Sequence, residues 1–167
     1  MTFDSEMQIR KATEADLAAI FSIYARARKF MAENGNGTQW GNVKPKKELV
    51  ESDIENGISY VCVKDGEVVG VFALIFGEDP TYKIIYDGEW LSEEPYATVH
   101  RIASSGKVKG TGEFCINWAL SQMPNIRIDT HKNNSVMRHL LSKLGFTYCG
   151  IIHLEDGDER LAFQKII

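Results

Sequence analysis

The chain has 167 residues, of which 44% are hydrophobic and 25% charged, and its formal net charge is −4. A chain of this size and composition is expected to form one soluble domain that buries about two-thirds of its unfolded surface. The acidic balance argues against non-specific nucleic-acid binding, which needs a basic face. No apolar run approaches the roughly 18 residues of a membrane span, and the N-terminus has no signal-peptide pattern. The three cysteines are an odd number without C-x-x-C spacing, which is typical of reduced, mostly buried thiols, so we expect a cytoplasmic protein.

The first part of the chain is predicted to form a strand, two helices and a hairpin. Residues 7–10 are expected to be extended, and apolar residues at helical spacing predict an amphipathic helix over residues 17–33. Thr13 is its expected N-cap, with Asp16 as a capping-box partner. A second helix is expected to have Pro45 in its first turn and to end at Gly57. Residues 58–63 and 68–76 are β-rich, and the Asp-Gly pair between them predicts a hairpin turn.

Two irregular segments carry aromatic residues. Trp40 lies on a polar, glycine-flanked loop, either as a plug packed onto the core or as the wall of a ligand site. Residues 78–95 are acidic and aromatic, and either form a solvated excursion or a rim that attracts a cationic amine. The aromatic candidates for substrate binding in that segment are Tyr82, Tyr86 and Trp90.

The central segment of the chain, residues 98–122, carries the clearest functional signal. Residues 98–103 are mostly β-branched or apolar and predict a buried strand, and residues 107–112 form a basic loop with two glycines. A helix is expected to open at Glu113, with an apolar face made of Phe114, Cys115, Trp118 and Ala119. Such a helix N-terminus offers unpaired N–H groups and the positive end of the helix dipole to an anion. The alternative is a structural corner with solvated lysines, because glycines often serve only the turn.

The last part of the chain is predicted to form a strand, a helix and a hairpin. Residues 126–130 are expected to form the strand, and Asn134 or Ser135 caps the helix that follows. Residues 146–154 and 160–166 form the hairpin, whose edge could pair with a second copy of the chain. The resulting order β-α-α-β-β-β-α-β-α-β-β predicts an α/β (α+β) fold with a mixed sheet.

Two blocks of the sequence resemble motifs of the GNAT N-acetyltransferase superfamily. Lys107-x-x-Gly110-x-Gly112 is similar to the family's Q/R-x-x-G-x-G/A loop. Residues 134–146 are similar to its N-x-x-A-x-x-L-Y-x-K-L-G-F motif, and both blocks stand in the family's order. The resemblance implies a single GNAT-like domain over residues 1–167, with a mostly antiparallel sheet flanked by helices. It also implies direct transfer of an acetyl group from acetyl-CoA to an amine.

The resemblance also implies where acetyl-CoA binds. The pantetheine arm would lie along the edge of the central strand, and the pyrophosphate would sit on the amides of the glycine loop. Asn134 would contact the arm and is compatible with a capping role. The implied cofactor-binding residues are Ile102, Ala103, Ser104, Lys107, Val108, Lys109, Gly110, Thr111, Gly112, Glu113, Asn134 and Lys143. The region between the first two helices contributes to the family's acceptor pocket, which favours Trp40 as a wall.

The candidates for acid–base chemistry are two histidines. His100 precedes the cofactor edge and is the leading base, since histidine titrates near neutrality; the alternative is a structural role. His131 could pair with Asp129 on one side of its strand, although a strand-end hydrogen bond is the alternative. The family's general-acid tyrosine falls on Leu141, which cannot donate a proton. No metal-ligand spacing occurs among the histidines and cysteines.

Three functions follow as hypotheses. The first is an acetyl-CoA-dependent N-acetyltransferase acting on a small amine or a peptide amine, with a possible homodimer as its assembly. The second is a non-catalytic acyl-CoA-binding or sensor module, which Leu141 keeps open. The third is an enzyme that binds a different phosphorylated ligand.

Overall fold

The computed structural model describes residues 6–41 and 43–167, so residues 1–5 and 42 of the predicted domain lie outside the described part. Seven strands form one sheet in the order β1-β2-β3-β4-β5-β7-β6. The strands are β1 (Gln8–Lys11), β2 (Ser59–Lys64), β3 (Glu67–Phe76), β4 (Ala97–Ser104), β5 (Asn125–Thr130), β6 (Thr147–His153) and β7 (Glu159–Ile166). The helices are α1 (Leu17–Glu33), α2 (Lys47–Glu55), α3 (Thr111–Gln122) and α4 (Ser135–Lys143), with 3-10 turns η1 (Glu14–Asp16) and η2 (Pro80–Tyr82). The predicted mixed, mostly antiparallel sheet flanked by helices is confirmed.

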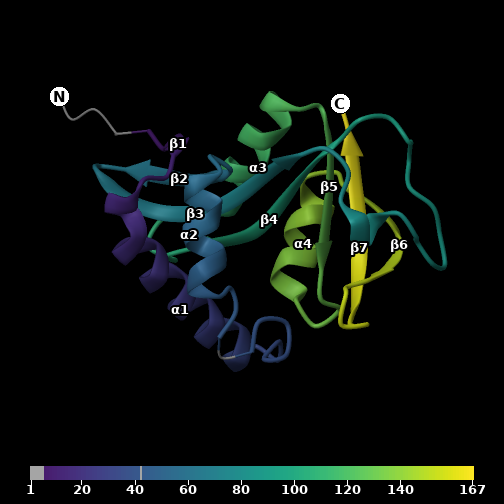
Figure 1. The fold of residues 1–167 in the computed structure, drawn as a ribbon, viewed down its shortest axis with the longest axis horizontal. Helices are drawn as coiled ribbons and strands as arrows, with labels where there is room; N and C mark the ends of the chain where they lie inside the picture. Colours follow the sequence, from purple (N-terminus) through teal and green to yellow (C-terminus); the bar gives the residue numbers. More distant parts are fainter. Residues whose placement is uncertain (1–5, 42) are drawn as a thin grey trace.

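Strands β4 and β5 are parallel and stay paired over a short stretch only. Their register pairs are Ala97 with Ile126 and Thr98 with Arg127, at the start of both strands. Beyond these pairs the two strands separate, and Figure 1 shows β4 slanting away from β5. The sheet is therefore open in its middle, where one edge of β4 has no strand partner.

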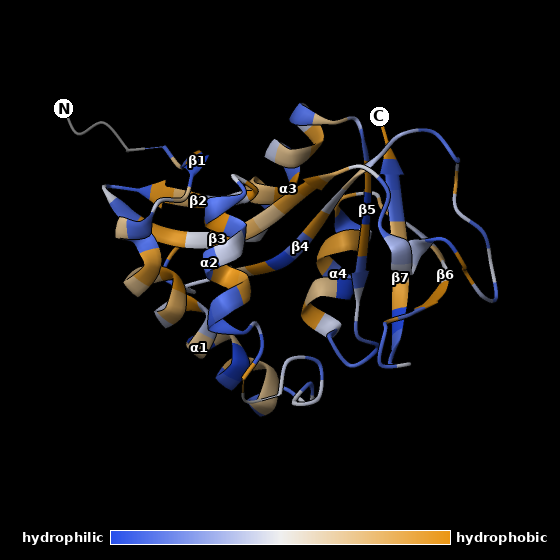
Figure 2. Cartoon of the chain, viewed as in Figure 1, coloured by the Kyte–Doolittle hydropathy of each residue, from blue (hydrophilic) through white to orange (hydrophobic). Residues whose placement is uncertain are grey.

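Three apolar clusters hold the fold together. One packs α3 and α4 onto one face of the sheet around Phe72, and a second packs α1 and α2 onto the other face around Ile20 and Tyr24. Figure 2 shows hydrophobic colour along β2 and β3, which both clusters use. The third cluster packs the connection between β3 and β4 against β6 and β7. The first cluster also includes Ile126 and Ile128 of β5 and Phe163 of β7, so it joins the two halves of the sheet beneath the opening.

The hairpin prediction is confirmed, and the predicted Thr13–Asp16 capping box forms, although it caps η1, the 3-10 turn that leads into α1. Asp65 and Gly66 both have positive φ, +52° and +77°, as the tight turn between β2 and β3 requires. Thr13 N–H donates to the carboxylate of Asp16 over 2.8 Å. The second helix, however, begins at Lys47 rather than at Pro45.

The helix after the central strand begins earlier than expected. It starts at Thr111, and the predicted start at Glu113 is wrong because Gly110, at φ +81°, turns the chain first. The predicted apolar face is also rotated: Cys115 and Ala119 are buried as expected, but Ile116 and Leu120 accompany them, and Phe114 and Trp118 are only partly buried. The earlier start leaves Gly112 inside the first turn of the helix.

The connection between β3 and β4 wraps around the β6 end of the sheet, visible as the teal chain in Figure 1. Tyr86 and Ile151 exchange two backbone hydrogen bonds of 2.8 Å across this edge. A Cβ on Gly88 would lie 1.9 Å from the carbonyl oxygen of Cys149, which shows how closely the chain passes. The hairpin edge that was expected to be free for a second copy is therefore partly covered. Among the described residues, no helix is both long and apolar enough to cross a membrane.

Candidate active site

A cavity of about 710 Å³ lies where β4 and β5 separate. Its walls come from β4, β5, the start of α4, the α1–α2 connection, the β6–β7 turn and the segment after β3. Its polar and aromatic lining includes Gln39, Trp40, Asp79, Thr81, His100, Arg101, Asp129, Asn134, Glu155 and Arg160, and Ile102 is among its apolar residues. The cavity thus brings together side chains from segments that are far apart in the sequence.

A β-bulge lies in β4 beside this cavity. Val71 pairs with Ala103 and Ala73 with His100, so two residues of β4, Arg101 and Ile102, stand opposite one residue of β3. Arg101 has a φ of +52°, a left-handed conformation that is uncommon for a residue with a side chain. The bulge bends β4 away from β5 and opens the sheet.

Tertiary contacts hold the bulge in place. The Arg101 guanidinium donates two hydrogen bonds to the buried carboxylate of Asp53 on α2, over 2.8 and 2.9 Å. The hydroxyl of Tyr24 on α1 donates to the Arg101 carbonyl oxygen over 2.7 Å. Both helices on this face of the sheet therefore fix the one strained residue of the strand.

The free edge of β4 lies next to the bulge. Ser105 N–H donates to the Val69 carbonyl of β3 over 2.8 Å. Because backbone groups alternate along a strand, the N–H and C=O groups of Ser104 and Ile102 point away from β3, toward the opening. Ile102 also lines the cavity, whereas the side chain of Ala103 is buried on the α1 side. The Ser104 carbonyl accepts a hydrogen bond of 3.1 Å from Arg26.

The glycine loop follows this edge and leads into α3, outside the cavity lining. Phe114 N–H donates the first helical bond, to Gly110 O over 3.0 Å, so the N–H groups of Thr111, Gly112 and Glu113 have no carbonyl one turn back to bind. Thr111 is buried, and its hydroxyl donates to Val108 O, so its side chain is already engaged within the protein. A set of free amides at a helix N-terminus is suited to a phosphate.

Of the predicted lysines around the loop, Lys107 and Lys143 each form an ion pair with a glutamate. Lys107 pairs with Glu67 over 2.6 Å, and Lys143 pairs with Glu113 over 3.2 Å. All four side chains are well exposed, so each pair contributes little to stability. The Lys143 ammonium offsets the charge of Glu113 at the helix N-terminus, and Lys109 is exposed on the same loop.

His100 stands at the centre of a polar cluster in the cavity. Its Nε2 lies 2.9 Å from Asp79 Oδ2, and its Nδ1 lies 3.9 Å from Asp129 Oδ1. The buried Tyr82 hydroxyl donates to the same Asp129 oxygen over 2.5 Å. Asp79 also accepts hydrogen bonds from the N–H and the hydroxyl of Thr81, over 2.9 and 2.7 Å. The histidine therefore lies between two carboxylates, each held by a second group.

Two pKa shifts describe this cluster. Burial raises the pKa of Asp79, but the hydrogen bonds from His100 and Thr81 outweigh it and hold the pKa at about 2. Burial and the neighbouring Asp129 carboxylate raise the pKa of Tyr82 well above its usual value. At neutral pH Asp79 is therefore an anion that accepts from the imidazole, and Tyr82 is a neutral donor.

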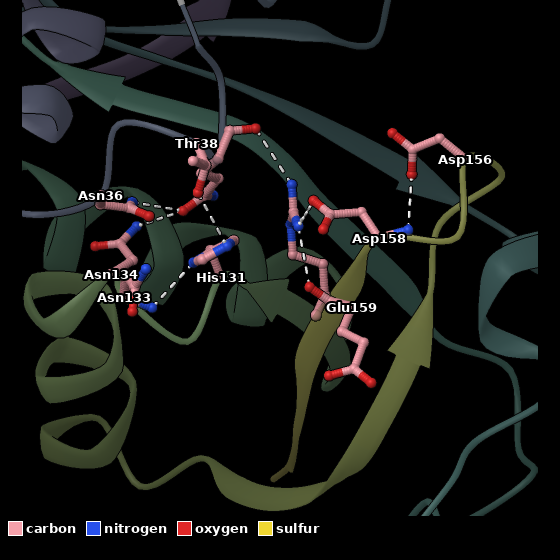
Figure 3. Close-up of polar contacts among 10 residues, drawn as sticks. Asn36, Thr38, His131, Asn133, Asn134, Asp156, Asp158 and Glu159 are labelled. Carbon is pink, nitrogen blue, oxygen red and sulfur yellow. Dashed lines mark hydrogen bonds and ion pairs between the residues drawn. The ribbon is translucent and has the colours of Figure 1, made fainter.

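The segment 36–40 crosses from α1 to the other half of the sheet, and we call it the strap. The Gln39 side-chain oxygen accepts hydrogen bonds from Asn36 and Asn134, over 2.8 and 3.2 Å, and Figure 3 shows Asn36, Thr38 and Asn134 lying close together. The Gln39 carbonyl accepts one from the buried Arg160 of β7, over 3.2 Å. Asn134 meanwhile caps α4 by accepting from Met137 N–H over 3.1 Å, which confirms the expected cap. The amide nitrogen of Asn134 thus already has a partner.

His131 lies behind the strap and does not line the cavity. Its Nδ1 accepts from Asn133 N–H over 3.0 Å, and its Nε2 lies 3.3 Å from the Thr38 hydroxyl. Burial and the nearby Arg160 charge lower the pKa of His131, which favours the neutral ring. The possible pairing with Asp129 does not form, because Asp129 contacts Tyr82 and His100 instead. The alternative of a strand-end hydrogen bond is confirmed.

The four predicted aromatic residues separate into two groups. Trp40 lines the cavity and also packs edge-on against Tyr24, with ring centroids 5.6 Å apart, so it is both wall and plug. Tyr82 and Trp90 are buried in the third cluster, and Tyr86 is exposed at the β6 edge, stacked on His153. None of these three lines the cavity. These three rings therefore do not face the cavity: Tyr82 and Trp90 are packed in the core, and Tyr86 lies outside the cavity at the β6 edge.

Sequence reasoning did not find Asp79, the Asp53–Arg101 pair or the strap. Asp79 lies 21 residues from His100, and Asp53 lies 48 residues from Arg101. Neither contact can therefore be predicted from a local sequence spacing. The only local signal at Asp79 is Asp-Pro, typical of the start of a helical turn. Among the described residues, no group of His, Cys, Asp and Glu side chains could hold a metal ion.

Comparison with known proteins places the chain among structures with this architecture. The crystal structure of a GNAT-family acetyltransferase from Streptococcus agalactiae is 34% identical, with 99% of this chain and 98% of that chain covered and a TM-score of 0.89. A Salmonella typhimurium protein with its cofactor acetyl-CoA is 19% identical, covers 96% and 93%, and has a TM-score of 0.60. The GNAT-superfamily phosphinothricin acetyltransferase of Sinorhizobium meliloti, in complex with acetyl-CoA, is 15% identical, covers 96% and 88%, and has a TM-score of 0.65. No family model matches the chain, and no curated protein is significantly similar to it.

Proposed function

The chain belongs to the GNAT family of acetyltransferases, and we propose that it transfers the acetyl group of acetyl-CoA directly to a primary amine of a small molecule or a peptide. The observation that supports this most is the continuity of the free β4 edge. The edge begins beside His100, passes the bulge at Arg101 and ends at the first turn of α3, whose leading amides have no helical partner. A long ligand with an amide-rich arm and a diphosphate at its far end fits such a path.

The proposed acetyl-CoA site uses backbone groups more than side chains. Ile102 and Ser104 would pair with the amides of the pantetheine arm as an added strand does, and the amides of Thr111, Gly112 and Glu113 would hold the pyrophosphate. Arg26 already reaches the Ser104 carbonyl and adds a positive charge on this side. Bound acetyl-CoA would supply the activated acetyl group.

His100 is the proposed base that removes a proton from the acceptor amine. The Asp79 carboxylate accepts from Nε2–H at 2.9 Å, which would fix the tautomer and leave the lone pair on Nδ1, inside the cavity. A free alkylamine has a pKa near 10.4, so it is mostly protonated at pH 7 and needs such a base. The N–H of Ile102, the second residue of the bulge, would polarise the thioester carbonyl.

A second candidate function is a module that binds acyl-CoA without catalysis. Leu141 stands where the resembled motif has its general-acid tyrosine, and its side chain is completely buried in the core between α4 and the sheet. No proton donor can act from that position. In the proposed transferase the leaving thiolate would therefore take its proton from water or from His100.

Titration calorimetry with acetyl-CoA and a screen of amines for thiol release test the proposal. We expect micromolar to low-millimolar binding of acetyl-CoA and release of CoA thiol with at least one primary amine. Binding without thiol release from any amine would favour the non-catalytic module. Absence of acetyl-CoA binding would reject both and leave another phosphorylated ligand as the alternative.

A further inference from the structure

We infer that Asp129 and His100 Nδ1 together form the binding site for the ammonium group of the acceptor, an inference that rests on the proposed function. Both side chains line the cavity, and Nδ1 lies 3.9 Å from Asp129 Oδ1. This separation is too long for a hydrogen bond between the two atoms. It suits one nitrogen that donates to both, at about 2.9 Å from each.

The occupancy of the other atoms leaves these two for a ligand. His100 Nε2 already contacts Asp79 Oδ2, so Nδ1 is the ring atom left to bind an acceptor. Within residues 6–41 and 43–167, His100 is the only cationic-type group within 4.0 Å of the Asp129 carboxylate. An acidic side chain at 10% exposure without a lysine or arginine partner is expected to bind a cation from outside.

Tyr82 fixes the carboxylate in position. Its ring is 1% exposed, and its hydroxyl donates to Asp129 Oδ1 over 2.5 Å. Because the phenol keeps its proton at neutral pH, it is a donor that orients Asp129 without neutralising it. Tyr82, which sequence reasoning placed against the acceptor itself, would thus act on the acceptor through Asp129, as a positioning residue.

The arrangement selects acceptors that carry N–H groups. Each of the three protons of a primary ammonium group has a destination in the reaction. A primary ammonium donates one N–H to Nδ1 and one to Asp129. One proton passes to Nδ1, the freed lone pair forms the C–N bond, and the C–S bond of the thioester breaks. The leaving thiolate takes one proton from His100 or through water, and the last ammonium proton stays on the amide nitrogen, so one ammonium and one thioester give one amide, one thiol and one proton. Quaternary ammonium ions lack N–H groups and cannot bridge the two atoms.

Asp129→Asn tests the site with little change of shape, since the asparagine oxygen can still accept from Tyr82. With the best amine of the screen and with n-butylamine, we expect KM for the amine to rise about 10- to 100-fold, the value of a charge-assisted hydrogen bond. The calorimetric Kd for acetyl-CoA should stay unchanged. Glu155→Gln is the matched control, because it removes one negative charge from the same cavity wall and should leave KM within about twofold. Equal effects of the two variants, or no effect of Asp129→Asn, would overturn the inference.

Binding to the unaltered protein tests the site independently of turnover and of variant folding. We expect n-butylammonium to shift the ring ¹⁵N resonance of His100, and n-butyltrimethylammonium at the same concentration to leave it in place. Equal shifts from the two cations, or none from n-butylammonium, would overturn the site even if the chain acetylates amines. A shift specific to n-butylammonium without any turnover would support the site and contradict the transferase function.

Discussion

The guanidinium of Arg101 and the carboxylate of Asp53 form a bidentate ion pair, 2.8 and 2.9 Å long, that holds a strained residue of the central strand. A left-handed conformation at a non-glycine residue costs about 1–3 kcal/mol and persists only when surrounding contacts enforce it. Asp53 is buried on α2 and Tyr24 is buried on α1, so the conformation is built into the packing of both helices. The bulge and the open edge of β4 therefore depend on this pair.

Asp53→Ala should destabilise the protein and weaken acetyl-CoA binding. Removing one partner leaves the Arg101 guanidinium without its counter-charge in a site that is 18% exposed, and we expect a loss of about 3 kcal/mol in the free energy of unfolding. Urea denaturation and calorimetry measure the two effects. Glu51→Ala on the same helix breaks the exposed Lys47–Glu51 pair and should cost about 0.5 kcal/mol or less. Similar losses in both variants would contradict a special role for the bulge.

Gly110→Ala should weaken acetyl-CoA binding through the backbone rather than by collision. No atom lies within 4 Å of a Cβ built there, but φ is +81°, a conformation that costs a residue with a Cβ about 1–2 kcal/mol. The loop would relax and its amides would lose their common direction. We expect a Kd about tenfold higher by calorimetry.

The control for this variant is Gly157→Ala in the β6–β7 turn. Gly157 has φ +86° and equally open space around its Cβ position, so the strain is matched while the phosphate loop is untouched. Its acetyl-CoA affinity should equal that of the unaltered protein. A Gly110→Ala variant with unchanged affinity would argue against the proposed pyrophosphate site.

Whether a feature of this structure can be predicted from the sequence depends on how far apart its interacting residues lie along the chain. The Asp65-Gly66 turn and the Thr13–Asp16 cap involve residues within three positions of each other, and local preferences were enough to find them. The sequence predicts the start of α3 two residues late, because from the sequence alone Gly110 could equally be a loop glycine. The order of elements and the two motifs were sufficient for the fold class, which does not require exact boundaries.

The chemistry of the site depends on contacts that no local pattern encodes. Asp79 reaches His100 across 21 positions and Tyr82 reaches Asp129 across 47, and both contacts exist because the segment after β3 folds back over the sheet. The same folding explains why Tyr82 and Trp90 were expected at a solvent-facing rim but are core residues. The composition of an acidic, aromatic segment does not indicate whether its aromatic side chains face the core or the solvent.

His100→Ala should lower turnover while leaving cofactor binding intact. Loss of a positioned base typically costs about 10²- to 10⁴-fold in rate, and the His100 ring contacts side chains of the acceptor end rather than the glycine loop. We expect kcat to fall in that range, the corresponding ionisation to vanish from the pH–rate profile, and the Kd for acetyl-CoA to stay within twofold. His139→Ala, an exposed histidine on α4, should change neither. An unaltered pH–rate profile in His100→Ala would reject its role as base.

Stability should fall in acid partly because of Asp79. Its pKa is about 2 in the folded protein and about 3.9 in an unfolded chain, so the unfolded state binds more protons between these values. The stabilisation is therefore fully present above about pH 4 and is lost as the pH falls through about 2; the difference between the two pKa values corresponds to about 2.6 kcal/mol. Urea denaturation of Asp79→Asn should show a free energy of unfolding about 2.6 kcal/mol lower at pH 7 and a flatter decline from pH 4 to pH 2.

Asp16, whose pKa the hydrogen bond from Arg10 lowers to about 2, acts in the same pH range, so part of the decline should remain in Asp79→Asn. Asp16→Asn should remove that other part. The two carboxylates share no partner, so their effects should add in the double variant. If Asp79→Asn declined as steeply as the unaltered protein between pH 4 and pH 2, the carboxylate would not be held by His100 and Thr81 as described, and the fixed tautomer of the proposed base would lose its support.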